Sequence, residues 1–270
     1  MQLADLTRKR EKWVEANREN GFEEGITNLL TELYPDNAHF IYELLQNAED
    51  THADAVRFTL SNGDIRFEHN GARLFNLRDV ESITSIGVST KRNDPTNIGK
   101  FGVGFKAVFA YTNIPEIHSG DFHFKINNLV VPESLPNTAN DGATVFHFPF
   151  NNPKKDTAKA VEEIEGGLRA LADNTLLFLH NIGKIEYRLP NGKSGNLRRV
   201  DVEGQGIGQR IEIHAIQPGE AEAVSNWLRY RKEVSITDEA GKTKTCQVAI
   251  AFRLKPQTDD SVSGQDGEKK

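Results

Sequence analysis

A carboxylate and a carboxamide stand four residues apart, at Glu43 and Asn47, and Asp50 follows three residues later. Residues three or four apart on a helix share a face, so a helix here would make these side chains neighbours. The Asn47 carbonyl oxygen is a hard ligand of the kind that Mg²⁺ prefers. The Glu43 carboxylate could orient and deprotonate a water molecule aimed at a terminal phosphate. Taken alone, however, the pattern more often indicates an ordinary amphipathic helix with a solvated face.

A glycine-rich segment, Ile98–Phe105, lies further along the chain and carries Gly99, Gly102 and Gly104. Glycines permit positive φ and close backbone approach, so successive amide N–H groups can converge on an anion. The segment Phe105–Tyr111 is predicted to be a helix, whose N-terminus would add partial positive charge at the same place. The segment therefore indicates a phosphate-binding loop.

Two common nucleotide motifs do not fit this glycine segment. The P-loop requires Gly-Lys followed by Ser or Thr, whereas Gly104 is followed by Phe105 and Lys106. The dinucleotide fingerprint requires a strand immediately before the loop and an acidic residue about twenty residues later. The run Ser89–Asn97 before this loop is polar and typical of a loop. A structural glycine turn remains open, but it would not account for the polar helix upstream.

The elements that must position these residues can be predicted from periodicity. The segment His39–Glu49 has a helical apolar face and Asn37 as a cap before it. The alternating runs Ala55–Leu60 and Asp64–Asn70 are predicted to pair as strands through an Asn-Gly turn. With further strands in 114–131 and Thr144–Phe148, we expect an α+β fold, an α/β sandwich with helices on a mixed, mostly antiparallel sheet.

The remaining segments predict a second part of the chain after residue 150. We expect a nucleotide-binding domain in residues 1–150, a smaller β-rich second domain in 151–256 that begins with a helix, and a disordered tail in 257–270. The predicted helices are Leu6–Asn20, Phe22–Leu33 and Thr157–Ala172, and the later predicted strands are Leu176–Leu179, Lys184–Leu189, Leu197–Val202, Arg210–Ile216 and Val248–Leu254. The glycines at 204, 206 and 208 lie between two strands, so a hairpin is predicted there.

With its two motifs in this order, the chain resembles the gyrase, heat-shock chaperone, histidine kinase and MutL (GHKL) ATPase superfamily over roughly residues 20–150. The segment Ile98–Phe105 is most similar to sacsin-like ATPase domains and to the ninety-kilodalton heat-shock chaperones. The resemblance implies the Bergerat form of the fold, Glu43 as general base, Asn47 as the Mg²⁺ ligand and Asp50 as the acidic residue completing that helix.

The same resemblance implies a phosphate loop, a mobile lid and a late Gly-Thr element beside the adenine. The lid would be Ser82–Asn97, with three residues facing the phosphates. The implied nucleotide-binding residues, besides those on the helix, are Ser89, Thr90, Lys91, Gly99, Lys100, Phe101, Gly102, Val103, Gly104, Phe105 and Thr144, with Gly142 preceding Thr144.

The residue that reads adenine departs from the family pattern. Relatives use an Asp in Asp-x-Gly-x-Gly at a strand end, but here the strand ends Glu68-His69-Asn70-Gly71. If Gly71 is the matching glycine, His69 occupies the Asp position, and a neutral imidazole or the Asn70 carboxamide could accept from the adenine amino group. We prefer Asn70, and Glu68 stays open if the strand is bulged. A turn residue at a strand end is the alternative reading of Asn-Gly.

The retained Glu43 favours Mg²⁺-dependent ATP hydrolysis over histidine kinase activity, and no phospho-acceptor helix hairpin precedes it in the sequence. The expected ligands are ATP, ADP and Mg²⁺. The expected partners are a second copy in an ATP-dependent homodimer and an unidentified protein client or effector domain. The alternative is a nucleotide-gated interaction module with negligible turnover, because the adenine position is altered and only Lys242 or Lys244 offers a weak candidate to sense the γ-phosphate. A degenerate fold kept for protein interaction is a third reading.

Composition is consistent with a cytoplasmic enzyme. The chain has 270 residues, a net charge of −6 and a single cysteine, Cys246, which fits a reducing compartment. The charge gives no basic footprint for nucleic acid, and no apolar run is long enough to span a membrane. None of the eight histidines shows metal-ligand spacing, so no zinc site is expected.

Overall fold

The computed structural model of the chain describes residues 2–22, 25, 38–86, 104–138, 142–202, 208–237 and 243–255. Several predicted elements fall outside these ranges, namely most of the helix Phe22–Leu33, most of the lid and the tail. The predicted nucleotide-binding residues that lie outside the described ranges are Ser89, Thr90, Lys91, Gly99, Lys100, Phe101, Gly102 and Val103.

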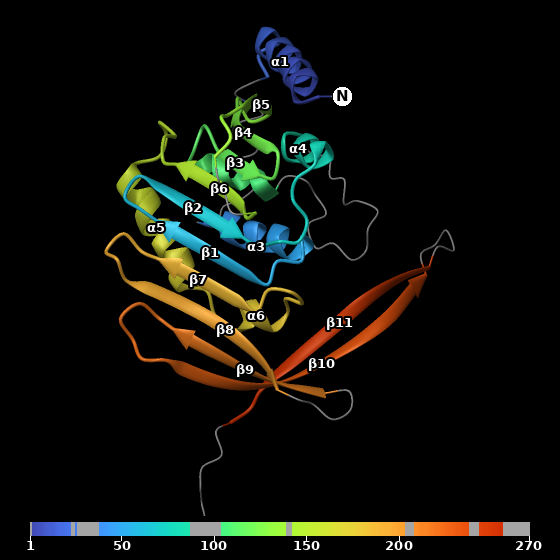
Figure 1. Cartoon of the computed structure of the whole chain (residues 1–270), viewed down its shortest axis with the longest axis vertical. Helices are drawn as coiled ribbons and strands as arrows, with labels where there is room; N and C mark the ends of the chain where they lie inside the picture. The colour runs from blue at the N-terminus through green and yellow to red at the C-terminus, as the bar shows by residue number, and fades with distance from the viewer. Residues whose placement is uncertain are drawn as a thin grey trace, which may run out of the picture.

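The described strands form one sheet (Figure 1). Their bounds are β1 Ala55–Leu60, β2 Asp64–His69, β3 Glu116–Ser119, β4 Phe122–Asn127, β5 Val131–Ser134, β6 Thr144–Pro149, β7 Lys184–Arg188, β8 Ser194–Val202, β9 Gly208–Ile216, β10 Ala223–Thr237 and β11 Thr243–Arg253. The sheet has eleven strands in the order β11-β10-β9-β8-β7-β1-β2-β6-β3-β4-β5. The β1–β7 pair is parallel, and the other recorded pairs are antiparallel. The predicted mixed, mostly antiparallel sheet is therefore confirmed.

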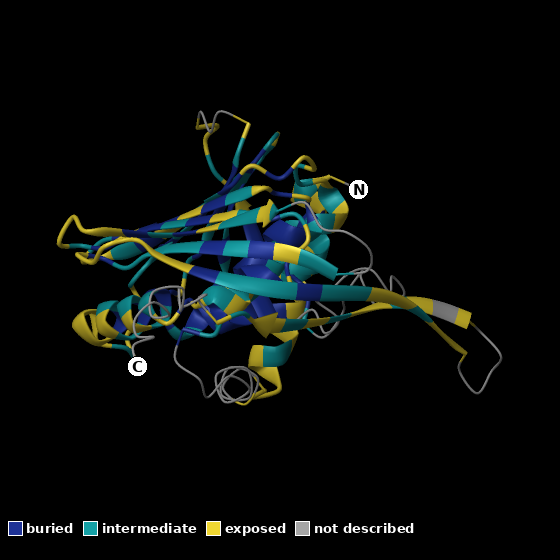
Figure 2. Cartoon of the chain, turned by 90° about the horizontal axis from the view of Figure 1, so that it is seen from below, coloured by how far each residue is buried: buried dark blue, intermediate teal, exposed yellow. Residues whose placement is uncertain are grey.

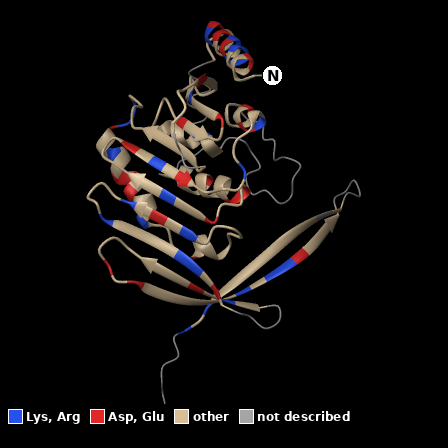
Figure 3. Cartoon of the chain, in the orientation of Figure 1, with Lys and Arg blue, Asp and Glu red and all other residues tan. Residues whose placement is uncertain are grey.

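Alternation along the strands separates a core face from an outer face. In β1 and β2 the buried residues include Phe58 and Phe67, which pair in register with ring centroids 4.6 Å apart. Arg57 and Arg66 point the other way and form ion pairs with Glu186 and Glu68. Residues of both signs are interspersed over β1, β2, β7 and β8 (Figure 3). The outer face is thus polar, and the apolar side chains gather on the inner face.

Helices cover the inner face of the sheet, and buried residues lie between the two layers (Figure 2). The described α-helices are α1 Leu3–Glu19, α3 Phe40–Asp50, α4 Leu77–Ile83, α5 Thr157–Arg169 and α6 Asp173–Leu177, and η1 Gly104–Ala110 is a 3₁₀ helix. Gly167 of α5 lies against the start of α3, where a Cβ would come within 2.7 Å of Ala38 Cβ and 2.9 Å of Ile41 Cδ1. This close approach explains why a residue unfavourable to helices stands inside α5.

Helix α1 lies beside β5, at the edge of the sheet (Figure 1). The Thr7 hydroxyl donates to the carbonyl of Pro132 at 2.6 Å, and the Arg10 guanidinium donates to the carbonyl of Glu81 and to the Ser85 hydroxyl. Helix α1 therefore connects β5 with the end of α4. Among the described residues, no helix is both long and apolar enough to cross a membrane.

Two sequence-based expectations need correction or qualification, and one strand was missed. The predicted strand Leu176–Leu179 is wrong, because its first residues belong to α6, and a short apolar run does not distinguish strand from buried helix. The helix predicted at Phe105–Tyr111 is present as the 3₁₀ helix η1. Strand β10 was not predicted, since arginines interrupt its apolar alternation. The sheet continues past residue 151, and the proposed division into two domains stays a prediction.

Candidate nucleotide site

The two motifs of the sequence meet in space at Glu43 and Gly104. Glu43 lies on the first turn of α3 with its side chain 21% exposed, and its carboxylate is 3.5 Å from His39 Nε2. Gly104 begins η1, directly after the predicted phosphate loop. A Cβ on Gly104 would lie 1.8 Å from Glu43 Oε2 and 2.2 Å from Glu43 Cδ. The carboxylate therefore occupies the space that any other residue at 104 would fill.

Helix α3 places the other two predicted side chains on the same face as Glu43. The helix spans Phe40–Asp50 as predicted to within one residue at each end, so Asn47 and Asp50 follow Glu43 by one and two turns. All three residues are half-buried, whereas Leu44 and other members of the apolar face are fully buried. The predicted common face is present, and it brings together two carboxylates and a carboxamide.

The end of β2 approaches the end of α3. His69 is buried and pairs in register with Thr144 of β6. The Gly71 amide donates to His69 Nδ1 at 3.2 Å, and a Cβ on Gly71 would lie 2.1 Å from Thr51 Oγ1. Thr144 Oγ1 lies 2.6 Å from the Ser119 hydroxyl. His69, Gly71 and Thr144 thus form a buried polar group beside the last turn of α3.

The two other residues considered for adenine have different surroundings. Asn70 Oδ1 accepts from the amides of Asp54 and Ala55 at 3.2 and 3.1 Å, and its Nδ2 donates to the Asp54 carboxylate. Glu68 pairs with Arg66 on the outer face of the sheet. The Asn70 side chain therefore holds the connection between α3 and β1, whereas His69 points to the inner face. The choice of adenine reader stays a prediction.

Burial lowers the pKa of His69 to about 4, because the charged imidazolium would lose its hydration. The unfolded chain binds a proton near the ordinary pKa of about 6.5. Between these values the unfolded state holds more protons, so the free energy of unfolding must fall as the pH drops from 6.5 towards 4.

We expect His69→Gln to reduce this acid sensitivity. The wild-type slope includes up to about 1.4 kcal/mol per pH unit from His69, and the variant lacks that contribution. Urea unfolding of both proteins at several pH values from 4 to 7.5 measures the difference. Parallel curves for the two proteins would show that His69 is not held neutral by the fold.

Lys106 is a buried residue near the site that sequence reasoning did not select. It follows Phe105, whose ring lies 6.1 Å from those of both Phe146 and Phe148. The ammonium group donates to the carbonyls of Ile83 and Leu129 at 2.8 and 2.5 Å, and burial lowers the Lys106 pKa to about 7. It therefore fixes η1 against the end of α4. In the sequence its only signal was its position after the glycine segment.

A cavity of about 570 Å³ lies elsewhere, between α1 and the β4–β5 hairpin. It is lined by Thr7, Glu11, Val14, Glu15, Arg18, Asn127, Asn128, Val131 and Glu133. None of the predicted nucleotide-site residues lines it, so the candidate site rests on the contacts around α3.

Comparison with known sequences supports the resemblance drawn from the motifs. A family model described as the Sacsin domain matches residues 67–131, which run from the end of β2 to β5. Protein NO VEIN of Arabidopsis thaliana is 29% identical over 254 residues, covering 84% of this chain. The chain is therefore similar to sacsin-domain sequences over residues 67–131. Human sacsin itself is 35% identical over 105 residues, or 33% of the chain. The predicted similarity to sacsin domains is thus confirmed.

The sacsin-like chain spans only 9% of Protein NO VEIN and 2% of human sacsin. Among solved structures, it is similar to the B subunit of DNA gyrase from Myxococcus xanthus, with a TM-score of 0.38, 13% identity and coverage of 75% of this chain and 67% of the other. The ATPase domain of Aquifex aeolicus MutL gives a TM-score of 0.30 and 13% identity, with 64% and 69% coverage. The α+β class itself is confirmed by the sheet and its helices.

Proposed function

We propose that this sacsin-like chain binds ATP with Mg²⁺ on the polar face of α3 and hydrolyses it. The observation that carries the proposal is the contact of Glu43 with Gly104, because it joins a candidate general base to the end of a candidate phosphate loop. A structural glycine turn has no need of a carboxylate at this position. A phosphate site with a hydrolytic water needs both groups within a few ångströms of each other.

Each group of the proposed site has a separate task. Glu43 would orient a water molecule in line with the γ-phosphate and accept its proton. The amides of residues 99–104 would bind phosphate oxygens, as would the start of η1. The half-buried amide of Asn47 offers an oxygen donor of the type that suits Mg²⁺, and Asp50 completes the polar face of the helix. When bound, Mg²⁺ would offset the negative charge on the phosphate oxygens.

The adenine ring of ATP would lie at the end of β2, beside Thr144. His69 is held neutral and its Nδ1 accepts from Gly71, whereas the Asn70 carboxamide already has backbone partners. We retain Asn70 as the preferred adenine reader and His69 and Glu68 as alternatives. Closure of the lid Ser82–Asn97 would switch the conformation or dimerisation of the chain and act on a client or effector domain in the cytoplasm.

Replacing Asn47 with Ala tests whether this residue binds the Mg²⁺ of Mg–ATP. We expect Mg–ATP affinity to fall at least tenfold, about 1.4 kcal/mol, because an oxygen donor is lost from the phosphate side of α3. Titration calorimetry with ATP, ADP and GTP, each with and without Mg²⁺, measures the change. Asn196→Ala is the matched control, since Asn196 pairs in register with Glu186 on the outer face of the sheet, away from α3. Equal affinities for all three proteins would refute the proposed site.

The alternative, a nucleotide-gated interaction module with negligible turnover, is favoured by one observation. The side chain at the preferred adenine position, Asn70, already bonds to the connection between α3 and β1. Phosphate release by wild type that equals release by a Glu43 variant, together with Mg–ATP binding, would select this alternative.

A further inference from the structure

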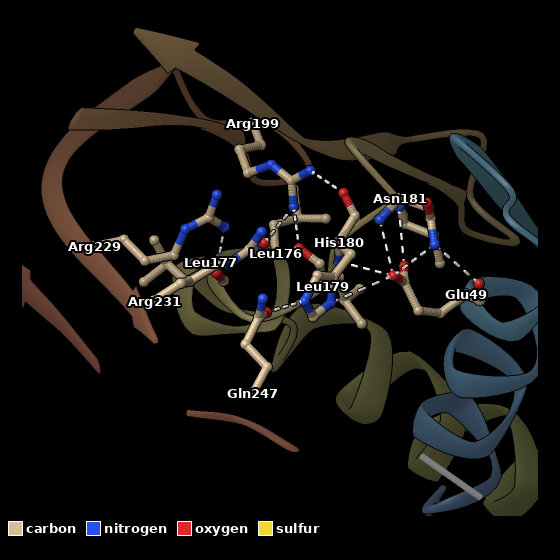
Figure 4. Close-up of polar contacts among 11 residues, drawn as sticks. Glu49, Leu176, Leu177, Leu179, His180, Asn181, Arg199, Arg229, Arg231 and Gln247 are labelled. Atoms are coloured by element: carbon tan, nitrogen blue, oxygen red, sulfur yellow. Dashed lines mark hydrogen bonds and ion pairs between the residues drawn. The ribbon is translucent and has the colours of Figure 1, made fainter. Parts of the chain in front are cut away.

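A third carboxylate of α3 is held by a loop from the later part of the chain. Glu49 is 4% exposed, and its carboxylate accepts four N–H groups (Figure 4). Three are the backbone amides of His180, Asn181 and Ile182, at 2.7, 2.8 and 3.0 Å, and the fourth is Asn181 Nδ2 at 3.0 Å. Asn181 Nδ2 also donates to the Glu49 carbonyl at 3.2 Å. A buried carboxylate with this many donors is a strong and directional anchor.

The anchor holds the side of α3 away from the nucleotide face. Successive residues turn by about 100° around a helix, so the Glu49 and Asn47 side chains point about 160° apart around the helix axis. Its bonds therefore lie on another side of the helix from Glu43 and Asn47, yet they fix the rotation of the helix that carries both. A misplacement of about 1 Å in reacting groups can reduce a rate about 100-fold, so this rotation matters for the proposed chemistry.

The same loop is held from its other side by three arginines of β8 and β10. The recorded bonds run from Arg199 to the carbonyls of Leu176, Leu179 and His180 at 2.9, 2.5 and 2.9 Å, from Arg229 to that of Leu177 at 2.7 Å, and from Arg231 to that of Leu179 at 3.1 Å. Figure 4 shows the arginines on one side of the loop and Glu49 on the other. Residues 176–182 thus connect α3 to the base of the β10–β11 hairpin.

The arginines depend on these carbonyls. Arg229 is 2% exposed, and burial together with the neighbouring Arg231 and Arg199 lowers the Arg229 pKa to about 10. Asp201 lies 3.5 Å from both Arg199 Nε and Arg229 Nη2. The carboxylates of Asp201 and Glu49 both attract the Arg231 guanidinium. Buried Nε atoms of Arg229 and Arg231 have no partner among the described residues. Because desolvated charge is costly, a shift of the loop would disturb both ends of the connection.

We propose that Glu49 is a positioning residue that couples the nucleotide site on α3 to the β10–β11 hairpin through residues 176–182. The proposal rests on the proposed function, because it assigns the β10–β11 hairpin as the element that regulates the same nucleotide site. Coupling is reciprocal, so nucleotide binding changes the state of the hairpin, and a partner bound to the hairpin changes nucleotide affinity by the same factor. A purely structural anchor would hold the loop equally with and without nucleotide.

The chain offers a spectroscopic probe of the hairpin. It has two tryptophans, Trp13 on α1 and Trp227 on β10. Trp227 is on the same strand face as Arg229 and Arg231, and its Nε1 donates to Ser225 Oγ at 2.8 Å. Trp13→Phe would leave Trp227 as the single indole. Its emission then reports the base of the hairpin while Mg–ATP is added and heat is recorded in parallel.

We expect Mg–ATP to shift the Trp227 emission in the Trp13→Phe protein. Adding Glu49→Gln should abolish the shift and weaken Mg–ATP affinity at least fivefold, since an amide replaces a carboxylate that fixes α3. Arg231→Gln on the hairpin should reduce the shift and serves as the second variant if Glu49→Gln does not fold. The matched control is Glu186→Gln on the outer face of β7, which should retain both the shift and the affinity.

The outcomes separate this inference from the proposed function. If the Trp13→Phe protein binds Mg–ATP and Trp227 does not respond, or responds equally with Glu49→Gln, the coupling is refuted and the nucleotide site stands. If calorimetry detects no Mg–ATP binding by wild type, the proposed function fails, and the coupling fails with it.

Discussion

Replacing Glu43 with Gln is expected to reduce ATP turnover by about 10²–10⁴-fold, the usual contribution of a positioned general base. Glutamine preserves the size of the side chain against Gly104 but cannot accept the proton of the attacking water. Mg–ATP affinity should stay within about threefold of wild type, because the change removes an interaction made chiefly in the transition state. Phosphate release under single-turnover conditions, with calorimetric titration beside it, measures both quantities.

The Glu43→Gln variant needs a control that removes a carboxylate outside the proposed site. Glu186→Gln removes a carboxylate from the outer face of β7, where Glu186 pairs with Arg57 and Lys184. Its turnover should equal that of wild type. Normal turnover in Glu43→Gln would remove Glu43 from the mechanism, and an equal loss in both variants would indicate a general effect on the fold.

The elements around the site could be predicted because their signals are local. The apolar periodicity of α3 and the alternation of β1 and β2 fixed these elements to within one residue. The contact between Glu43 and Gly104 was different, since the two lie far apart in sequence and no periodicity relates them. Only the family resemblance indicated that they would meet, and the geometry then placed them together.

The features that the sequence patterns did not identify involve polar residues whose partners are buried and distant in the sequence. Strand β10 was missed because Arg229 and Arg231 stand where apolar residues would mark a buried face. Glu49 was passed over because a carboxylate on a helix is usually solvated, whereas its donors come from residues 180–182. In both cases the partner is distant in the sequence. A pattern that depends on tertiary hydrogen bonds leaves no local trace in the chain.

Gly104→Ala is expected to reduce ATP turnover about as much as Glu43→Ala does, with little change in folding stability. The backbone of Gly104 is not in the left-handed region, so alanine introduces no conformational strain. The nearest atoms to the new Cβ would all belong to the Glu43 carboxylate, at 1.8, 2.2 and 2.7 Å. A flexible side chain can move away at small energetic cost, but the carboxylate would then leave the position from which it acts on water.

A double-mutant cycle distinguishes this mechanism from damage to the phosphate loop. If alanine at 104 acts by displacing Glu43, adding Gly104→Ala to Glu43→Ala should cause no further loss of turnover, because the displaced group is already absent. If it acts on the loop, the two losses should multiply, and Mg–ATP affinity should fall in Gly104→Ala alone. Urea unfolding of all four proteins shows whether stability stays within about 1 kcal/mol of wild type. Multiplied losses would mean that the closeness of Glu43 and Gly104 has no catalytic role.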